Sequence, residues 1–273
     1  MRGRGSPGAW WSGYGTKLQH LIRRTHTVLT YINATFRGMD ERLERAGAWC
    51  GIATMVTIGV TLVAIGRLIP PFSPTDNAAR ITHIIIDHKI RIRVGVALSL
   101  VGFALTIPLV AALSMRLRRI EGQLGVLSLI QIIGGVFLPI ATIIPLMLLT
   151  VATYRPEQRP PEITQAFSDA FWLMFVGTVG PIFMQCTALA IGAFIDRNDP
   201  RVFPRWFGYL NVWCAVLFLP GGAVVLFNDG PLAWNGVFAF WIPVVVFFVW
   251  MTALSVVTLR SIGAQLPGVK FPV

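Results

Sequence analysis

The sequence is poor in charge, and its charged residues are absent from long stretches. Only 13% of the 273 residues are charged, whereas soluble proteins carry about 25%. Six stretches contain no Asp, Glu, Lys or Arg: 46–66, 94–115, 122–154, 170–195, 206–228 and 230–259. Each can cross the ~30 Å of bilayer hydrocarbon, because a spanning helix needs about 20 apolar residues. This pattern excludes a soluble domain and predicts an all-α, polytopic membrane bundle of six transmembrane helices.

Histidine is scarce, and the familiar catalytic motifs are missing. The four histidines are His20, His26, His83 and His88, and none falls within a predicted span. A bis-histidine haem between helices and a histidine-rich di-iron centre are therefore excluded. The sequence also contains no G-x-x-x-x-G-K-[ST], H-E-x-x-H or G-x-S-x-G motif. We expect no cofactor and assign no catalytic residue.

Cysteine is scarce as well. Cys50, Cys186 and Cys214 all lie within predicted spans, and there is no C-x-x-C motif. A zinc site or a redox pair is therefore not indicated. The three thiols are interpreted as small buried hydrophobic side chains.

Basic residues outnumber acidic residues by 23 to 12, and the net charge is +11. They lie mostly beside predicted spans, which is typical of a topology signal, so we expect no nucleic-acid partner. If the N-terminus is cytoplasmic, seven of the 23 lie outside and the other sixteen inside; the seven are Arg67, Arg80, Lys89, Arg91, Arg93, Arg155 and Arg159. Because cytoplasmic loops carry the excess of Lys and Arg, a cell-membrane protein with both termini in the cytoplasm is predicted.

Four tryptophans fall close to expected membrane boundaries. Trp172 and Trp234 lie near predicted outer boundaries, and Trp49 and Trp206 lie near predicted inner ones. Tryptophan is enriched at both membrane surfaces because its ring is amphipathic. We therefore expect these four rings at the two interfaces.

A basic cytoplasmic tail, residues 1–45, precedes the predicted membrane domain 46–260, and residues 261–273 form a second short tail. From Lys17 to about Arg37 the spacing predicts an amphipathic helix, with a mostly apolar seam at Leu18, Ile22, Thr25, Leu29, Ile32, Phe36, Met39 and Leu43. A basic helix before a first span is typical of binding to anionic lipid of the inner leaflet. The alternative is a coiled-coil contact with a membrane-protein partner or with a second copy of the chain.

Prolines occur in five of the six predicted spans. They are Pro108, Pro139, Pro145, Pro181, Pro220 and Pro243. Each removes one backbone hydrogen bond and predicts a kink. Broken helices often mark a substrate path in transporters, although proline and glycine are also common in membrane helices in general.

The segment 78–93, before the second uncharged stretch, combines an apolar face with a polar one. His83 and Asp87 are one helical turn apart and can reach one cation, and His88 follows, so these three residues are the candidate metal site. His88 lies about 100° around the helix from Asp87, and Arg91 can pair with Asp87, both of which favour a solvated surface instead. The helix either extends beyond the membrane or lies along its surface and bends near Gly95.

Three amide side chains fall within the spans at similar predicted depths. They are Gln131, Gln185 and Asn211. Amides within a membrane commonly hydrogen-bond between helices and hold them together. They can equally orient a polar group on an apolar substrate, so they are candidates for packing or for substrate lining.

Three functions remain open. The first is a carrier or permease-like protein for a hydrophobic small molecule, which the uncharged, proline-rich spans favour. The second is a non-catalytic subunit or scaffold of a membrane complex, which the basic N-terminal helix favours. The third is a membrane enzyme that acts on an apolar substrate through His83, Asp87 and His88.

The charge count predicts the membrane topology. Reporter fusions after Lys270 and within 157–168 are expected on opposite sides of the membrane, with Lys270 in the cytoplasm. A cytoplasmic signal from the 157–168 fusion would contradict this topology.

Overall fold

The computed structural model describes residues 40–263. The expected amphipathic helix between Lys17 and Arg37 lies outside them, and so does the segment 264–273. The chain divides after Leu43, and the part from Glu44 onward forms one unit. All regular structure in residues 40–263 is helical, and six helical segments are long and apolar enough to cross a membrane: Asp40–Ile65, Ala78–Glu121, Val126–Tyr154, Pro161–Ile195, Arg205–Val225 and Gly230–Ile262. The predicted all-α, six-span architecture is confirmed.

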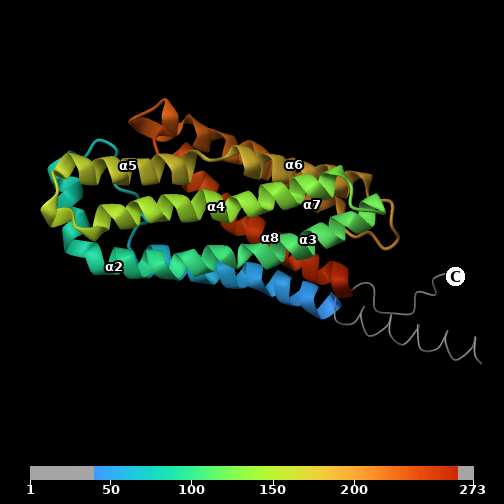
Figure 1. The fold of residues 1–273 in the computed structure, drawn as a ribbon. Helices are drawn as coiled ribbons and strands as arrows, with labels where there is room; N and C mark the ends of the chain where they lie inside the picture. The colour runs from blue at the N-terminus through green and yellow to red at the C-terminus, as the bar shows by residue number, and fades with distance from the viewer. Residues whose placement is uncertain (1–39, 264–273) are drawn as a thin grey trace, which may run out of the picture. The chain divides into compact units, whose positions relative to one another are not determined.

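The spans are assembled from shorter elements (Figure 1). The first ends in the π-helical turn η1 (Gly59–Ile65), and the second contains α2 (Ala78–Ala104) and α3 (Thr106–Glu121). The third is α4 (Val126–Tyr154), which η2 (Pro156–Gln158) connects to α5 (Pro161–Gly177) and α6 (Gly180–Ile195) of the fourth. The fifth contains α7 (Arg205–Phe218) and η3 (Leu219–Val225), and the sixth contains η4 (Gly230–Leu232), η5 (Val237–Trp241) and α8 (Ile242–Gly263).

Five of these six spans are not continuous α-helices: two are broken inside the span, and the other three change their hydrogen-bonding pattern at or near one end. The breaks are the π-helical η1, the turn at Leu105, the unwound pair Thr178–Val179, the 3-10 helix η3 and the π-helical η5. All except η1 lie within about one turn of a proline, which has no N–H to continue the helix. The third span is the exception among the proline-containing spans, because Pro139 and Pro145 both lie inside the uninterrupted α4.

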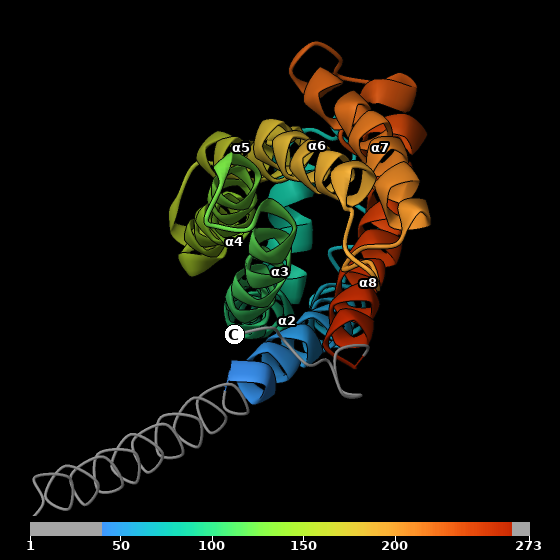
Figure 2. The ribbon, with the colours of Figure 1, turned by 90° about the vertical axis from the view of Figure 1, so that its right-hand side faces the viewer.

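The helix α4 has one exposed face, and its other side contacts four helices. It packs against α2, α3, α5 and α6, while α7 packs against both α6 and α8. Figure 2 shows α6 between the α4–α5 pair and α7. The sixth span returns to the second through the contact between α8 and α3, and η1 packs on α2. The interior therefore receives side chains from every span.

The first span approaches its neighbours closely at Gly47 and Gly51. A Cβ at Gly47 would overlap the carbonyl oxygen of Pro108, and one at Gly51 would overlap the Ser255 hydroxyl. These two glycines are four residues apart, which is the spacing that lets membrane helices pack backbone to backbone. This spacing is the sequence signal for the contact.

A buried ion pair lies at the end of the bundle that carries Arg116, which we call the Arg116 end. The side chain of Arg116 on α3 is fully buried and pairs with Glu44 of the first span. Glu44 also lies 3.6 Å from Arg119. Because a buried charge is tolerated only when it is paired, this ion pair fixes the first span against the end of α3.

Two carboxylates organise the turns at the Arg116 end. The Glu121 carboxylate accepts the backbone N–H groups of Leu127 and Ser128 at 3.0 and 2.9 Å, and thereby caps the start of α4. A negative charge is favourable there because the N–H groups of a first turn have no partner within the helix. The buried Asp196 accepts two backbone N–H groups of the loop that precedes α7, at 2.7 and 2.9 Å.

The opposite end, which we call the Pro161 end, extends the second span beyond the hydrocarbon. The helix α2 is uninterrupted over 27 residues, and the break falls at Leu105 rather than near Gly95 as one of our alternatives required. Its length of about 40 Å exceeds the ~30 Å of hydrocarbon. Because α2 packs on α5 and η2, and Lys89 bonds Glu157 at 2.5 Å, the segment 78–93 is held against the rest of the bundle.

The expectation for Trp172 is wrong. Its side chain is 1% exposed, and its ring packs among Phe72, Phe171, Phe175 and Phe240. A hydrophobic ring near the end of an apolar stretch can be buried or lie at the interface, and helix packing decides between the two. Trp49 and Trp206 are exposed on the bundle surface, as expected for interface rings.

Removing Glu44 tests the buried ion pair. Glu44→Ala is expected to lower the free energy of unfolding by about 3–5 kcal/mol, because the charge of Arg116 then remains buried without this partner. Unfolding of the purified protein in detergent measures the loss. The exposed Glu162 supplies the control, since Glu162→Ala should change stability by less than about 0.5 kcal/mol; equal losses for the two variants would contradict the prediction.

Candidate functional site

The candidate metal residues lie on the first turns of α2. His83 Nδ1 is 2.9 Å from Asp87 Oδ2, and the two side chains are 78% and 50% exposed. Asp87 therefore pairs with His83, whereas the sequence had indicated Arg91 as its partner. The imidazole lies one helical turn from the carboxylate on its N-terminal side, as Arg91 does on its C-terminal side.

His88 does not join this pair in a metal-binding group. Within residues 40–263, no three His, Cys, Asp or Glu side chains gather closely enough to hold a metal ion. His83 also lies 20 residues before Phe103 along the uninterrupted α2, a distance of about 30 Å. This separation leaves the His83–Asp87 pair far from the interior of the bundle.

One of the three amides forms a hydrogen bond between helices and a second bond within its own helix. Asn211 on α7 is buried, and its Oδ1 accepts the indole N–H of Trp250 on α8 at 2.9 Å. Its Nδ2 donates to the carbonyl of Phe207 at 2.8 Å. Asn211 therefore has a packing role at the α7–α8 contact.

The other two amides have no such partners. Gln131 on α4 is fully buried, and neither its Nε2 nor its Oε1 has a hydrogen-bond partner among the described residues. Gln185 on α6 is 1% exposed, and its Oε1 is also without a partner there. Gln185 packs over Gly134 and Gly135 of α4, one turn from Gln131. The contact between α4 and α6 therefore brings the two glutamines into one region without bonding them to each other.

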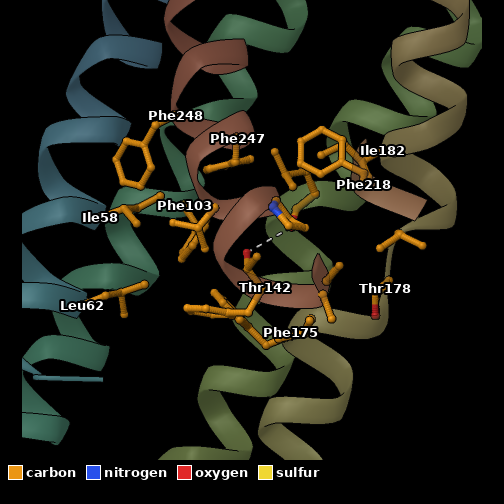
Figure 3. A pocket seen from close by; sticks show the side chains of 18 of the residues that line it. Ile58, Leu62, Phe103, Thr142, Phe175, Thr178, Ile182, Phe218, Phe247 and Phe248 are labelled. Carbon is orange, nitrogen blue, oxygen red and sulfur yellow. Dashed lines mark hydrogen bonds between the residues drawn. The ribbon is translucent and has the colours of Figure 1, made fainter. Parts of the chain in front are cut away.

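An apolar cavity lies inside the bundle (Figure 3). Its volume is about 140 Å³, and every span contributes to its wall. Six phenylalanines line it, together with aliphatic side chains and two threonines; the phenylalanines are Phe103, Phe175, Phe218, Phe240, Phe247 and Phe248. All of its lining side chains are buried or half-buried.

The wall of the cavity contains residues from each of the five helix breaks or from the turn beside them. Ile58 directly precedes η1, and Leu62 lies within it. Phe103 lies two residues before the turn at Leu105. Thr178 and Val179 form the unwound pair between α5 and α6. Phe218 ends α7 where η3 begins, and Ala239, Phe240 and Pro243 surround the junction of η5 with α8. The breaks are therefore gathered around one interior space.

The cavity offers few polar groups. None of its described lining residues is charged, and its polar side chains are Thr142 and Thr178. The Thr142 hydroxyl donates within α4, to the carbonyls of Leu138 or Pro139 at 3.1 and 3.0 Å, and Thr178 donates to Met174 at 2.7 Å. Both hydroxyl oxygens keep lone pairs with which they can accept a hydrogen bond. The cavity can therefore hold an uncharged, mainly apolar molecule.

Residues 46–255 match the family described as Domain of unknown function (DUF4386). The chain belongs to the DUF4386 family. No curated protein and no solved structure matches it. All lining residues of the cavity, from Ile58 to Phe248, lie within the DUF4386 domain.

The cavity of the DUF4386 domain has no clear signal in the amino-acid sequence. Its phenylalanines come from four different spans and share no spacing that would set them apart from the other 12 of the 18 in the chain. The prolines were the available signal, because Pro243 lies in the cavity wall and others lie near the breaks that border it. Without the depth of each span in the bundle, that signal could not be assigned to one place.

Replacing Asn211 tests the assigned packing role. Asn211→Leu is expected to lower the free energy of unfolding by about 0.6 kcal/mol, the typical value of a hydrogen bond between membrane helices. Unfolding of Asn211→Leu, Trp250→Phe and the double variant completes a thermodynamic cycle. Coupling indistinguishable from zero would show that the bond adds nothing to the α7–α8 contact.

Proposed function

We propose that this DUF4386 protein is a carrier that binds a small, neutral, hydrophobic molecule in the interior cavity. The observation that carries the proposal is the gathering of the five helix breaks around that cavity. In transporters, discontinuous helices commonly border the substrate site near the middle of the membrane. A bundle that only needed to be stable would have no reason to concentrate its weakest backbone segments around one space.

The size and lining of the cavity restrict the class of ligand. An apolar cavity of roughly 150 Å³ accommodates one benzene molecule, so about 140 Å³ has room for a single ring or a short branched chain. The phenylalanine side chains favour an aromatic ring, because ring pairs gain about 0.5–1.5 kcal/mol beyond the burial of their area. A charged ligand is disfavoured, since no charged side chain among the described residues faces it across the cavity.

The breaks supply the means of movement. A π-helical turn, a 3-10 turn and an unwound pair hold the backbone less tightly than an α-helix does, and hinges form where a few residues absorb the change in backbone angles. Thr178 and Val179 separate α5 from α6, so the two halves of the fourth span can tilt separately. Tilting at this point opens the cavity toward one end of the bundle or the other.

Filling the cavity tests this function with a matched pair of variants. Val244 lines the cavity, whereas its neighbour Val245 is 61% exposed on the outer surface of α8. We expect Val244→Phe to reduce ligand occupancy at least tenfold, because the added ring atoms occupy part of a space that holds only one ligand of benzene size. Val245→Phe adds the same atoms on the exposed side and should leave occupancy unchanged.

Photolabelling measures the occupancy. The protein in lipid nanodiscs is exposed to a phenyl diazirine with increasing toluene, and labelled peptides are identified by mass spectrometry. Labelling of 175–182 and 239–248 should be saturable and displaced by toluene, and should disappear in Val244→Phe only. Equal labelling of both variants would contradict binding in the cavity.

Proteoliposomes then separate a carrier from a static binding site. Val244→Cys should react with a membrane-impermeant maleimide added to either face of the bilayer, and saturating toluene should slow both reactions. Reaction from one face only would contradict the carrier function.

A further inference from the structure

Two buried hydroxyls on α5 behave differently from the other helical hydroxyls of the described chain. A buried serine or threonine in a helix usually donates to the carbonyl one turn earlier. Five buried hydroxyls here do so, and the pairs are Thr54 to Cys50, Ser114 to Val110, Thr142 to Leu138, Ser255 to Met251 and Thr258 to Leu254. Thr164 and Ser168 are fully buried, yet their hydroxyls have no partner among the described residues.

The indole groups show the same contrast. The N–H of Trp234 donates to the carbonyl of Phe72, and that of Trp250 donates to Asn211, each at 2.9 Å. Trp172 is as deeply buried as Trp250, but its Nε1 has no partner among the described residues. An indole N–H can only donate, so whatever satisfies Trp172 must be an acceptor.

These groups form a line along one side of the fourth span. Thr164, Ser168 and Trp172 are spaced by four residues, and Phe175 of the cavity wall continues the same helical face. Trp172 also touches the wall directly, since its ring centre is 6.1 Å from that of Phe240.

The line continues beyond the cavity. Gln185 lies one turn after the lining residue Ile182 on α6, and Gln131 faces the same contact from α4. From Thr164 to Gln185 there are 21 residues, which correspond to about 30 Å, the thickness of the hydrocarbon. Gln131, Thr164, Ser168, Trp172 and Gln185 of this line are all buried and carry polar atoms without a partner among residues 40–263.

A buried polar group without a partner costs free energy, and the cost is greatest where no bulk water is present. Five such side chains on two adjacent spans therefore point to a ligand that the fold is arranged to meet. We propose that Thr164, Ser168, Trp172, Gln185 and Gln131 line a polar path across the bilayer that accepts neutral, oxygen-bearing molecules. Water occupies the path at rest, and the oxygen of the cavity's ligand follows it in transit.

The path defines the substrate class more narrowly than the cavity alone does. The ligand has an apolar body that fits the cavity and one uncharged oxygen, as in a phenol or a small alcohol. This part of the inference rests on the proposed carrier function. The presence of water beside Trp172 does not rest on the carrier function. The water path and the carrier function can therefore fail separately.

Nuclear magnetic resonance of indole N–H groups tests for the water. The full chain, labelled with ¹⁵N-tryptophan in nanodiscs, gives separate signals for its indoles, and Trp172→Phe and Trp250→Phe assign two of them. The Trp172 N–H is expected to exchange with D₂O at least tenfold faster than the equally buried Trp250 and to show a cross-peak to water. Exchange less than tenfold faster, or no water cross-peak, overturns the path.

A serine pair shows whether the water belongs to the line. Ser168→Ala should slow the exchange of Trp172 at least threefold, because it removes the next group along the path. Ser255→Ala removes an equally buried hydroxyl that is bonded to Met251, and should leave the Trp172 exchange rate unchanged. Equal effects of the two variants on the exchange rate would show that the exchange of Trp172 does not depend on Ser168 in particular. That result overturns the assignment.

Phenol and toluene are nearly equal in size, but only phenol carries an oxygen. Comparing them distinguishes a path that accepts the oxygen of a ligand from one that accepts water alone. At equal concentration in the membrane, phenol should shift the Trp172 indole signal and slow its exchange, whereas toluene should do neither. Fast water exchange without a phenol effect overturns the substrate assignment while leaving the water path. The loss of photolabelling in Val244→Phe, measured in parallel with these spectra, tests ligand binding in the cavity and does not depend on the polar path.

Discussion

Within a bilayer no water reaches the backbone, so each N–H and C=O of a spanning segment must find its partner inside the protein. This constraint explains where the spans of this protein can be irregular. The turn at Leu105, the unwound pair at Thr178 and the π-helical η5 each belong to the wall of the cavity or lie beside it. A break on the exposed surface would leave its freed carbonyls facing lipid. The cavity and the broken helices are therefore two results of one requirement.

The same constraint divides the polar side chains into two groups. Asn211 and Trp250 satisfy each other and add to the cohesion of α7 and α8. Gln131, Ser168 and Trp172 are equally buried but have no partner among the described residues. Because unsatisfied groups are costly in this environment, packing explains the first group, and the second group is the basis of the polar path that we propose.

Charge is confined to the ends of the bundle. The buried pair of Glu44 and Arg116 lies at one end, where Glu121 and Asp196 also order the turns. The bond between Lys89 and Glu157 lies at the other end, beyond the hydrocarbon. The interior between them is uncharged along the cavity wall, which fits a neutral ligand and leaves the ends to hold the spans in register.

The sequence by itself determined the class of fold and the number of spans. Uncharged stretches longer than about 20 residues have one stable form in a bilayer, the helix, and this conclusion needs no knowledge of neighbours. The sequence also pointed to Asn211, Gln131 and Gln185 as unusual. Only the tertiary structure decided that Asn211 is paired while the two glutamines are not, that Trp172 is buried rather than at the interface, and that Asp87 pairs with His83. Each of these depends on how far a helix is rotated and how deeply it lies against the next one, and no local pattern of residues sets those two quantities.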